Sequence, residues 1–168
     1  MRISLVTFAV IARLVPHPWN ITPVGAFGLF AGTKMTLRQA WLVPIVALFV
    51  SDLITGFYSL TVMIGVYLGF AAAPFIGRLL IRDDENPRQI LGAVGVNALV
   101  FYLVSNFAVW AAGYYPATLE GLIACYAAGL SYMGISALGD SFYCALLFGG
   151  QAAFRRMYSA SNIGGNLT

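Results

Sequence analysis

Residues 39–57, with the sequence QAWLVPIVALFVSDLITGF, form an apolar run long enough to cross a membrane as a helix. A helix needs about 20 residues to cross a hydrocarbon core of about 30 Å. Asp52 is the only charged residue in this run. Similar apolar runs occupy residues 60–80 and 89–112, on either side of the polar loop IRDDENPR at 81–88. The pattern predicts an all-α, polytopic membrane helix bundle.

The composition also favours a membrane protein. Of the 168 residues, 60% are hydrophobic and 9% are charged, whereas about 25% of the residues of a soluble domain are charged. The basic residues stand singly or in pairs at the ends of apolar runs, which indicates topology rather than nucleic-acid binding. Cys125 and Cys144 lie inside apolar runs without metal or disulfide spacing, so we expect buried cysteines and neither metal nor cofactor. Nucleotide-binding and hydrolase motifs are absent from the sequence, so we expect no enzymatic activity.

About six transmembrane helices account for the apolar runs. We predict one membrane domain at residues 1–157, followed by a flexible tail at 158–168. The two N-terminal segments are short, so we expect them either to tilt or to form a hairpin that crosses with help from its neighbours. Residues 118–131 are predicted as a half-helix before the last span. The expected spans are about 3–15, 22–33, 39–57, 60–80, 89–112 and 135–154.

The basic residues fall on one side of this arrangement. With the N-terminus inside, Arg13 is the only Lys or Arg on the outer side. Cytoplasmic loops carry an excess of Lys and Arg, so both termini are predicted to be cytoplasmic, in a bacterial cytoplasmic membrane. The bases expected on the inner side are Arg2, Lys34, Arg38, Arg78, Arg82, Arg88, Arg155 and Arg156.

Asp52 and Asp140 are carboxylates expected on the outer side. A charge at the centre of a bilayer costs about 2.5–3.5 kcal/mol on insertion scales, so an intramembrane carboxylate is a candidate for function. Asp52 either pairs with Arg13 at the end of its helix or contacts a ligand in a cavity. Asp140 is expected in the first turns of the last span, where an acid either caps the helix start or meets a solute.

The run RLVPHPWNITP at residues 13–23 predicts a stiff loop, because prolines stand on both sides of His17. Trp19 suits an anchor at the membrane interface, and Asn20 suits the cap of the next helix. Contact with a solute is the alternative for these residues. His17 has no second His and no Cys nearby, so we expect no metal site there.

Asn106 and Trp110 are four residues apart, on one face of the span predicted at 89–112. An amide and an aromatic ring on one face suit the binding of a flat polar ring. The alternative is an interhelical hydrogen bond together with an interfacial aromatic belt.

Glycines at a spacing of four occur twice, as Gly28 with Gly32 and as Gly65 with Gly69. Small residues at this spacing let helix backbones approach closely in lipid. We expect them to pack helices within the bundle, and docking to a partner protein is the alternative.

The order of these features resembles the substrate-binding S components of energy-coupling-factor transporters, which are small six-helix bacterial membrane proteins. The run PHPWNITP also resembles an uncharacterised family of bacterial membrane proteins. The segments that carry the first resemblance are ITPVGAFGLFAGTKM at 21–35, WLVPIVALFVSDLITGFY at 41–58, MIGVYLGFAAAPFIGRLL at 63–80, VNALVFYLVSNFAVW at 96–110 and ALGDSFYCALLFGGQAAFRR at 137–156.

The resemblance implies capture of a small, vitamin-like solute near the outer side, with a transmembrane coupling subunit and ATPases as partners. S components usually carry two alanines four apart on the first span for docking to that subunit. Here Arg13 replaces the second alanine of such a pair with Ala9, which departs from the docking pattern. The predicted solute-binding residues are Arg13, His17, Trp19, Asn20, Asp52, Asn106, Trp110 and Asp140.

Two functions follow from these observations. The first is a solute-binding membrane protein, a component of a transporter that captures a small organic solute on the outer side. The alternative is a structural or accessory subunit of a larger membrane complex, with no solute site of its own. The first predicts that the outer polar residues converge on one pocket, and the second predicts that they cap helices or face separate interfaces.

Overall fold

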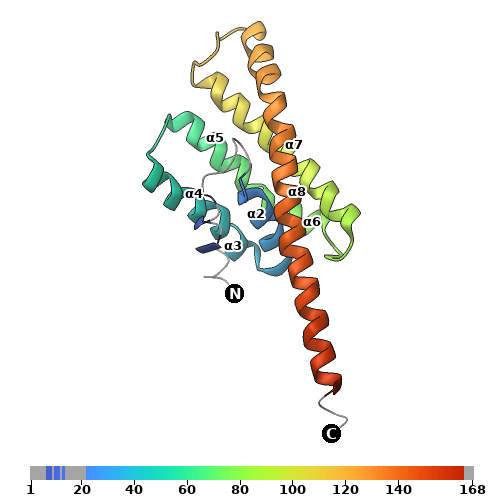
Figure 1. Ribbon diagram of the computed structural model, residues 1–168. Coiled ribbons are helices and arrows are strands. Elements are labelled where there is room, and N and C mark those ends of the chain that lie inside the picture. The colour runs from blue at the N-terminus through green and yellow to red at the C-terminus, as the bar shows by residue number, and fades with distance from the viewer. Residues whose placement is uncertain (1–6, 9, 12, 14–21, 165–168) are drawn as a thin grey trace.

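The computed structural model describes residues 7–8, 10–11, 13 and 22–164, and this part of the chain contains helices and no strand. The all-α prediction is confirmed. Figure 1 shows the helices as a bundle from which the C-terminal end of α8 projects. The helices are α2 at Val24–Lys34, α3 at Leu37–Ala40, α4 at Leu42–Thr55, α5 at Leu60–Ala71, α6 at Ala73–Leu80, α7 at Pro87–Ala111 and α8 at Leu119–Gly164.

Four helical stretches in the described part are long and apolar enough to cross a membrane, so the chain is a membrane protein. Three of them match the runs predicted at 39–57, 60–80 and 89–112. Helix α2 is different, because its 11 residues span only about 16 Å, roughly half of a hydrocarbon core. The four stretches are Leu37–Thr55, Leu60–Leu80, Pro87–Ala111 and Leu119–Ser159.

Prolines divide two of these stretches. Helices α5 and α6 are separated at Ala72, two residues before Pro74, because proline cannot donate the backbone hydrogen bond that would continue the helix. Helices α3 and α4 are separated at Trp41, shortly before Pro44. At the start of α7, Pro87 occupies the first turn, and the Asn86 side chain accepts a hydrogen bond from the Arg88 N–H at 3.0 Å.

The short helix α2 lies at the centre of the bundle and contacts α3, α4, α5, α6, α7 and α8 (Figure 1). Its residues from Val24 to Gly32 are buried. Glycines bring α2 and α6 together: a Cβ at Gly28 would stand 2.6 Å from the Ala73 Cβ, and one at Gly32 would stand 2.1 Å from the Pro74 carbonyl oxygen. No side chain fits in either place, which explains the glycine spacing.

The second pair of glycines packs α5 against α7. A Cβ at Gly65 would stand 2.2 Å from the Ala108 Cβ, and one at Gly69 would stand 2.8 Å from the Phe101 ring. The prediction that both spacings pack helices within the bundle is confirmed. Such contacts matter in lipid, where association depends on close packing rather than on exclusion of water.

Helix α8 corrects the prediction of a half-helix at 118–131 followed by a separate span. Its 46 residues run without interruption from Leu119 to Gly164. The last proline of the sequence is Pro116, and isolated glycines do not end a helix in lipid, because every backbone group must find its partner inside the segment. The helix also continues into residues 158–164, where the flexible tail was expected.

Candidate functional site

Asp52 lies in the last turns of α4 and is buried, with 1% of its surface exposed. Its Oδ1 lies 3.3 Å from Nη2 of Arg13, and the Nε of Arg13 donates a hydrogen bond to the Ser51 hydroxyl at 2.6 Å. The Tyr67 hydroxyl on α5 donates to the other carboxylate oxygen at 2.9 Å. A buried charge needs such partners. The pairing with Arg13, one of the two roles inferred from the sequence, is present.

The pKa of Tyr58, in the loop between α4 and α5, is affected by the same carboxylate. Burial raises the pKa of its phenol above 10.0, the negative charge of Asp52 raises it further, and Arg13 opposes the shift. Tyr58 therefore stays protonated and neutral beside the Arg13–Asp52 pair.

Asp140 does not cap its own helix, which was one of the two roles predicted for it. It lies inside α8 rather than at the start of a helix, so it cannot cap its own helix. Its Oδ1 accepts a hydrogen bond from the Ala26 N–H at 2.9 Å, and its Oδ2 accepts one from the Asn97 Nδ2 at 3.0 Å. Ala26 is in the first turn of α2, whose N–H groups lack intrahelical partners and form the positive end of the helix dipole. Asp140 therefore caps α2 from a distant helix.

Gly25 makes room for this cap. A Cβ at this position would stand 2.2 Å from Oδ2 of Asp140 and 2.7 Å from Nδ2 of Asn97. The Asn97 side chain is buried, and its Oδ1 has no hydrogen-bond partner among the described residues. Both carboxylate oxygens of Asp140 therefore accept a hydrogen bond, whereas Oδ1 of Asn97 is an unused acceptor among the described residues.

Asn106, on α7, stands against Gly129 of α8, where an added Cβ would lie 2.2 Å from Oδ1 of the amide. Its Nδ2 donates to the Tyr102 carbonyl oxygen at 2.8 Å. Around this amide lie two adjoining cavities of about 450 and 210 Å³, which we call the Asn106 cavities. Both are lined by Asn106, Val109, Gly129 and Tyr132.

The remaining lining gives the Asn106 cavities a mixed character. The larger cavity adds Tyr115, Cys125 and Ala128 to the shared set. The smaller one reaches α5 through Val66 and continues along α7 and α8. Its further lining residues are Phe101, Tyr102, Ser105, Met133 and Ser136.

Trp110 closes the turn between α7 and α8. Its indole N–H donates to the Pro116 carbonyl oxygen at 2.9 Å, and its ring lies 5.6 Å from the Phe107 ring, centroid to centroid. The indole N–H thus stabilises the turn, whereas Asn106 lines the cavities. The predicted shared face is present in the helix, but the two side chains have different contacts.

Among the described residues the predicted site residues therefore form separate sets. Arg13 and Asp52 lie together, Asp140 caps α2, Asn106 lines the cavities, and Trp110 closes a turn. His17, Trp19 and Asn20 lie outside the described residues. Within the described ranges, no three His, Cys, Asp or Glu side chains gather as metal ligands do.

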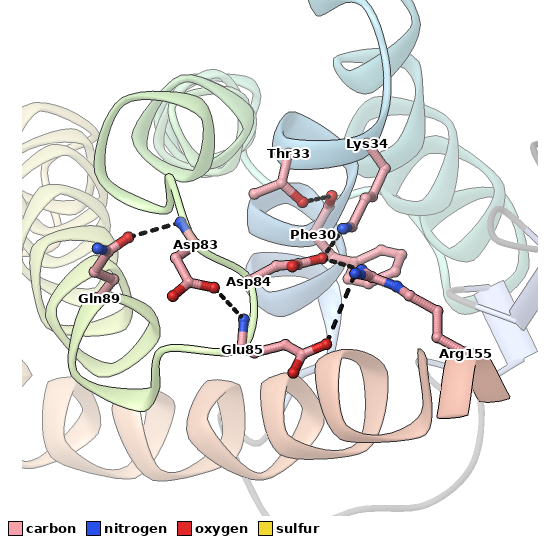
Figure 2. Close-up of polar contacts among 8 residues, drawn as sticks. All are labelled: Phe30, Thr33, Lys34, Asp83, Asp84, Glu85, Gln89 and Arg155. Atoms are coloured by element: carbon pink, nitrogen blue, oxygen red, sulfur yellow. Dashed lines mark hydrogen bonds and ion pairs between the residues drawn. The ribbon is translucent and has the colours of Figure 1, made fainter. Parts of the chain in front are cut away.

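Charged residues form a cluster at the other end of the bundle, where the sequence analysis used the basic residues only to predict topology (Figure 2). Lys34 at the end of α2 and Arg155 on α8 both pair with Asp84, in the loop between α6 and α7. Glu85 lies 3.8 Å from Arg155 and 3.6 Å from Arg156. We call these five residues the ion-pair cluster. The signal for it was the acidic run at 83–85, placed among the inner bases.

The loop that carries these acids is held by side chains. The Gln89 Oε1 accepts from the backbone N–H groups of Arg82 and Asp83 at 2.8 and 2.9 Å, and Asp83 accepts from the Glu85 N–H at 3.0 Å. Burial lowers the pKa of the Lys34 ammonium, and the positive charge of Arg155 lowers it further. Asp84 offsets part of this repulsion by lying against both bases, which ties α2, the loop and α8 together.

The family model described as "Family of unknown function (DUF6580)" matches residues 1–161. The chain belongs to the DUF6580 family. This agrees with the predicted membership of an uncharacterised membrane protein family. No curated protein and no solved structure matches this DUF6580 chain.

Proposed function

We propose that this DUF6580 protein binds a small organic solute in the Asn106 cavities and serves as the solute-capturing component of a transporter. The observation that carries the proposal is the polar amide of Asn106, which lines two adjoining cavities between spanning helices. Ligand pockets usually measure about 300–1,000 Å³ and combine apolar walls with a few polar groups. The larger cavity falls in this range.

The lining indicates the kind of solute. The Nδ2 of Asn106 donates one hydrogen to the Tyr102 carbonyl oxygen, and the amide carries a second donor hydrogen and an acceptor oxygen besides. Tyr115 and Tyr132 add aromatic faces and hydroxyl groups to the larger cavity. Such a set suits a partly planar molecule with hydrogen-bonding edges, and a vitamin-like solute has this chemistry.

The orientation in the membrane is part of the proposal. We infer six spans in a bacterial cytoplasmic membrane, with both termini and the ion-pair cluster on the cytoplasmic side, because Lys and Arg favour that side. The Asn106 cavities then lie toward the outer side. By the same topology the pair of Arg13 with Asp52, which is separate from the Asn106 cavities, and the sequence run with His17, Trp19 and Asn20 are assigned to the outer side.

The likeness to S components supports a transport role and rests on sequence patterns alone. The chain carries no nucleotide-binding loop, and in this proposal ATP-hydrolysing partners supply the energy for release of the solute. A transmembrane coupling subunit with ATPases is the partner set that this likeness implies. Arg13 faces Ser51 and Asp52, so its charged end is held inside the protein.

An accessory subunit of a larger membrane complex is the second candidate. The observation that favours it is the use of both buried carboxylates in internal contacts, Asp52 with Arg13 and Asp140 with α2. A protein of this kind needs no solute, and its acids serve to hold the bundle together.

Native mass spectrometry of the purified protein separates the two candidates. We expect a small molecule to co-purify, to be lost in Asn106→Leu and Ala128→Leu, and to remain in Ala127→Leu. Both alanines are exposed, but only Ala128 lines the larger cavity, so Ala127→Leu serves as the matched control. A stable set of partner subunits without a bound small molecule would instead support the accessory role, and equal retention by all variants would place the solute elsewhere.

A further inference from the structure

A second cavity lies between α7 and α8, toward the ion-pair cluster and away from Asn106. It measures about 420 Å³, and we call it the α7–α8 groove. Pro87, Ile90 and Leu91 form its α7 side, and α8 supplies the other side. The α8 residues that line it, apart from the charged end, are Ser141, Cys144, Ala145, Phe148, Gly149 and Ala152.

The groove is shaped by small residues on one face of α8. Ala145, Gly149 and Ala152 follow each other at helical spacing, and apart from the adjacent part of α8 itself no described atom lies within 4 Å of the position that a Cβ at Gly149 would occupy. Cys144 and Phe148 are buried beneath them, while Ala145, Gly149 and Leu91 are exposed. In a membrane, an open apolar groove between two spanning helices meets acyl chains.

The end of the groove carries charges of both signs. Glu85 and Arg156 line it and lie 3.6 Å apart, with side chains 44% and 78% exposed. An ion pair this exposed contributes little to stability, so both groups remain able to meet a ligand. Asp84, which also lines the groove, is already paired with Lys34 and Arg155.

Figure 2 shows how the loop holds Glu85 in place: Gln89 contacts Asp83, and Asp83 contacts Glu85. The backbone of Glu85 is therefore held by the loop, and its carboxylate lies 3.8 Å from Arg155 and 3.6 Å from Arg156. A headgroup at this end of the groove meets an anionic and a cationic side chain that lie next to each other.

We propose that the α7–α8 groove binds one phospholipid whose headgroup carries both a phosphate and a primary amine. The phosphate meets the guanidinium of Arg156, the ammonium meets the carboxylate of Glu85, and an acyl chain lies along Ala145, Gly149 and Ala152. Basic pockets between spanning helices on the cytoplasmic side of membrane proteins bind phosphate-bearing lipid headgroups. Arginine suits phosphate because its planar donors match two phosphate oxygens.

The proposal distinguishes among phospholipids with the same acyl chains. Phosphatidylethanolamine offers a phosphate and an ammonium that can donate hydrogen bonds. Phosphatidylcholine has a quaternary ammonium without such donors, and phosphatidylglycerol has no cation. We therefore expect the first lipid to bind about tenfold more tightly than the other two, which corresponds to about 1.4 kcal/mol.

Native mass spectrometry of the full-length protein in detergent, titrated with each of the three dioleoyl lipids, tests this inference. In Glu85→Gln the preference for phosphatidylethanolamine should vanish, and in Arg156→Gln binding of all three lipids should fall about tenfold. Gly149→Leu fills the groove and should abolish binding, whereas Gly150→Leu, an adjacent exposed glycine with equally open space, should retain it.

Three outcomes would overturn the inference. The first is equal binding of phosphatidylethanolamine and phosphatidylcholine by the unaltered protein. The second is retention of the preference in Gly149→Leu. The third is a dimer or a bound partner protein that Gly149→Leu disrupts and Gly150→Leu does not, because the groove would then hold a protein helix. Circular dichroism spectra of both glycine variants should match that of the unaltered protein, so that a loss of binding can be told from a loss of fold.

Discussion

Replacement of Asp140 by alanine should destabilise the protein much more than replacement by asparagine. Alanine removes the acceptor for two buried donors, the Ala26 N–H and the Asn97 Nδ2. A buried donor left without a partner costs about 1–3 kcal/mol, so we expect a loss of about 2–6 kcal/mol in the free energy of unfolding.

Asparagine at the same position keeps an acceptor for the Ala26 N–H. The unused Oδ1 of Asn97 can then turn to accept from the new amide, because it has no other partner among the described residues. The main loss is the attraction of a negative charge for the positive end of α2, which is worth about 0.3–1 kcal/mol and up to about 2 kcal/mol in a partly buried site.

Unfolding by sodium dodecyl sulfate from a mild detergent, followed by tryptophan fluorescence, measures both losses. Leu138→Ala is the control, since this side chain is 73% exposed on the same helix. The cap assigned to Asp140 is wrong if Asp140→Ala unfolds like the unaltered protein, or if Asp140→Asn costs as much as Asp140→Ala.

Three further predictions concern contacts of named residues. Gly25→Ala should lower the free energy of unfolding by about 1–3 kcal/mol in the same assay, because the added methyl group would press on the Asp140 carboxylate. Gly95→Ala, where the space is open, should not destabilise the protein. Equal effects of the two substitutions would contradict the close approach at Gly25. Arg13→Met should lower the free energy of unfolding by about 3 kcal/mol, because it leaves the buried Asp52 charge unpaired. Adding Asp52→Asn should recover part of this loss. If the effects of the two substitutions simply add, the two residues do not interact. The phenol of Tyr58 should ionise above pH 10.0, because its pKa is raised in the folded state. Its contribution to stability is therefore present below that pH and is lost as the pH rises through the raised pKa. Ultraviolet titration of the unaltered protein against Tyr58→Phe checks this, and ionisation at or below pH 10.0 would contradict it.

Local sequence patterns predicted much of the fold. The apolar runs at 39–57, 60–80 and 89–112 gave helices at nearly those positions, since length and hydropathy largely decide which segments span. The glycine spacings predicted tight packing, because small residues at a spacing of four share one helix face. The partner of Asp52 was also predictable, because Arg13 was the only base expected on that side.

The errors arose where distant contacts decide the outcome. Residues 118–131 were predicted as a half-helix before a separate last span, yet a backbone break is costly in lipid, and α8 is continuous. Because of this error, Asp140 was predicted to lie at the start of a helix. Its true role depends on the N-terminus of α2 being buried at the centre of the bundle, which no local pattern around residue 140 reveals.

The candidate site was predictable only in part. Asn106 was identified because it shares one helix face with Trp110, four residues further on, and it does line cavities. Tyr132 and Cys125, which share the larger cavity, were not identified, since aromatic and small residues in an apolar segment resemble ordinary packing. Their role depends on how α8 crosses α7, a property of the whole bundle.

The most direct test of the proposed function is an experimental structure of the full-length protein purified from its own membrane into a lipid nanodisc. We expect density for a compact, non-lipid molecule in contact with the Asn106 side chain, between α7 and α8. Density for an acyl chain in the Asn106 cavities, or cavities closed by repacked side chains, would contradict the claim that this DUF6580 protein binds a solute there.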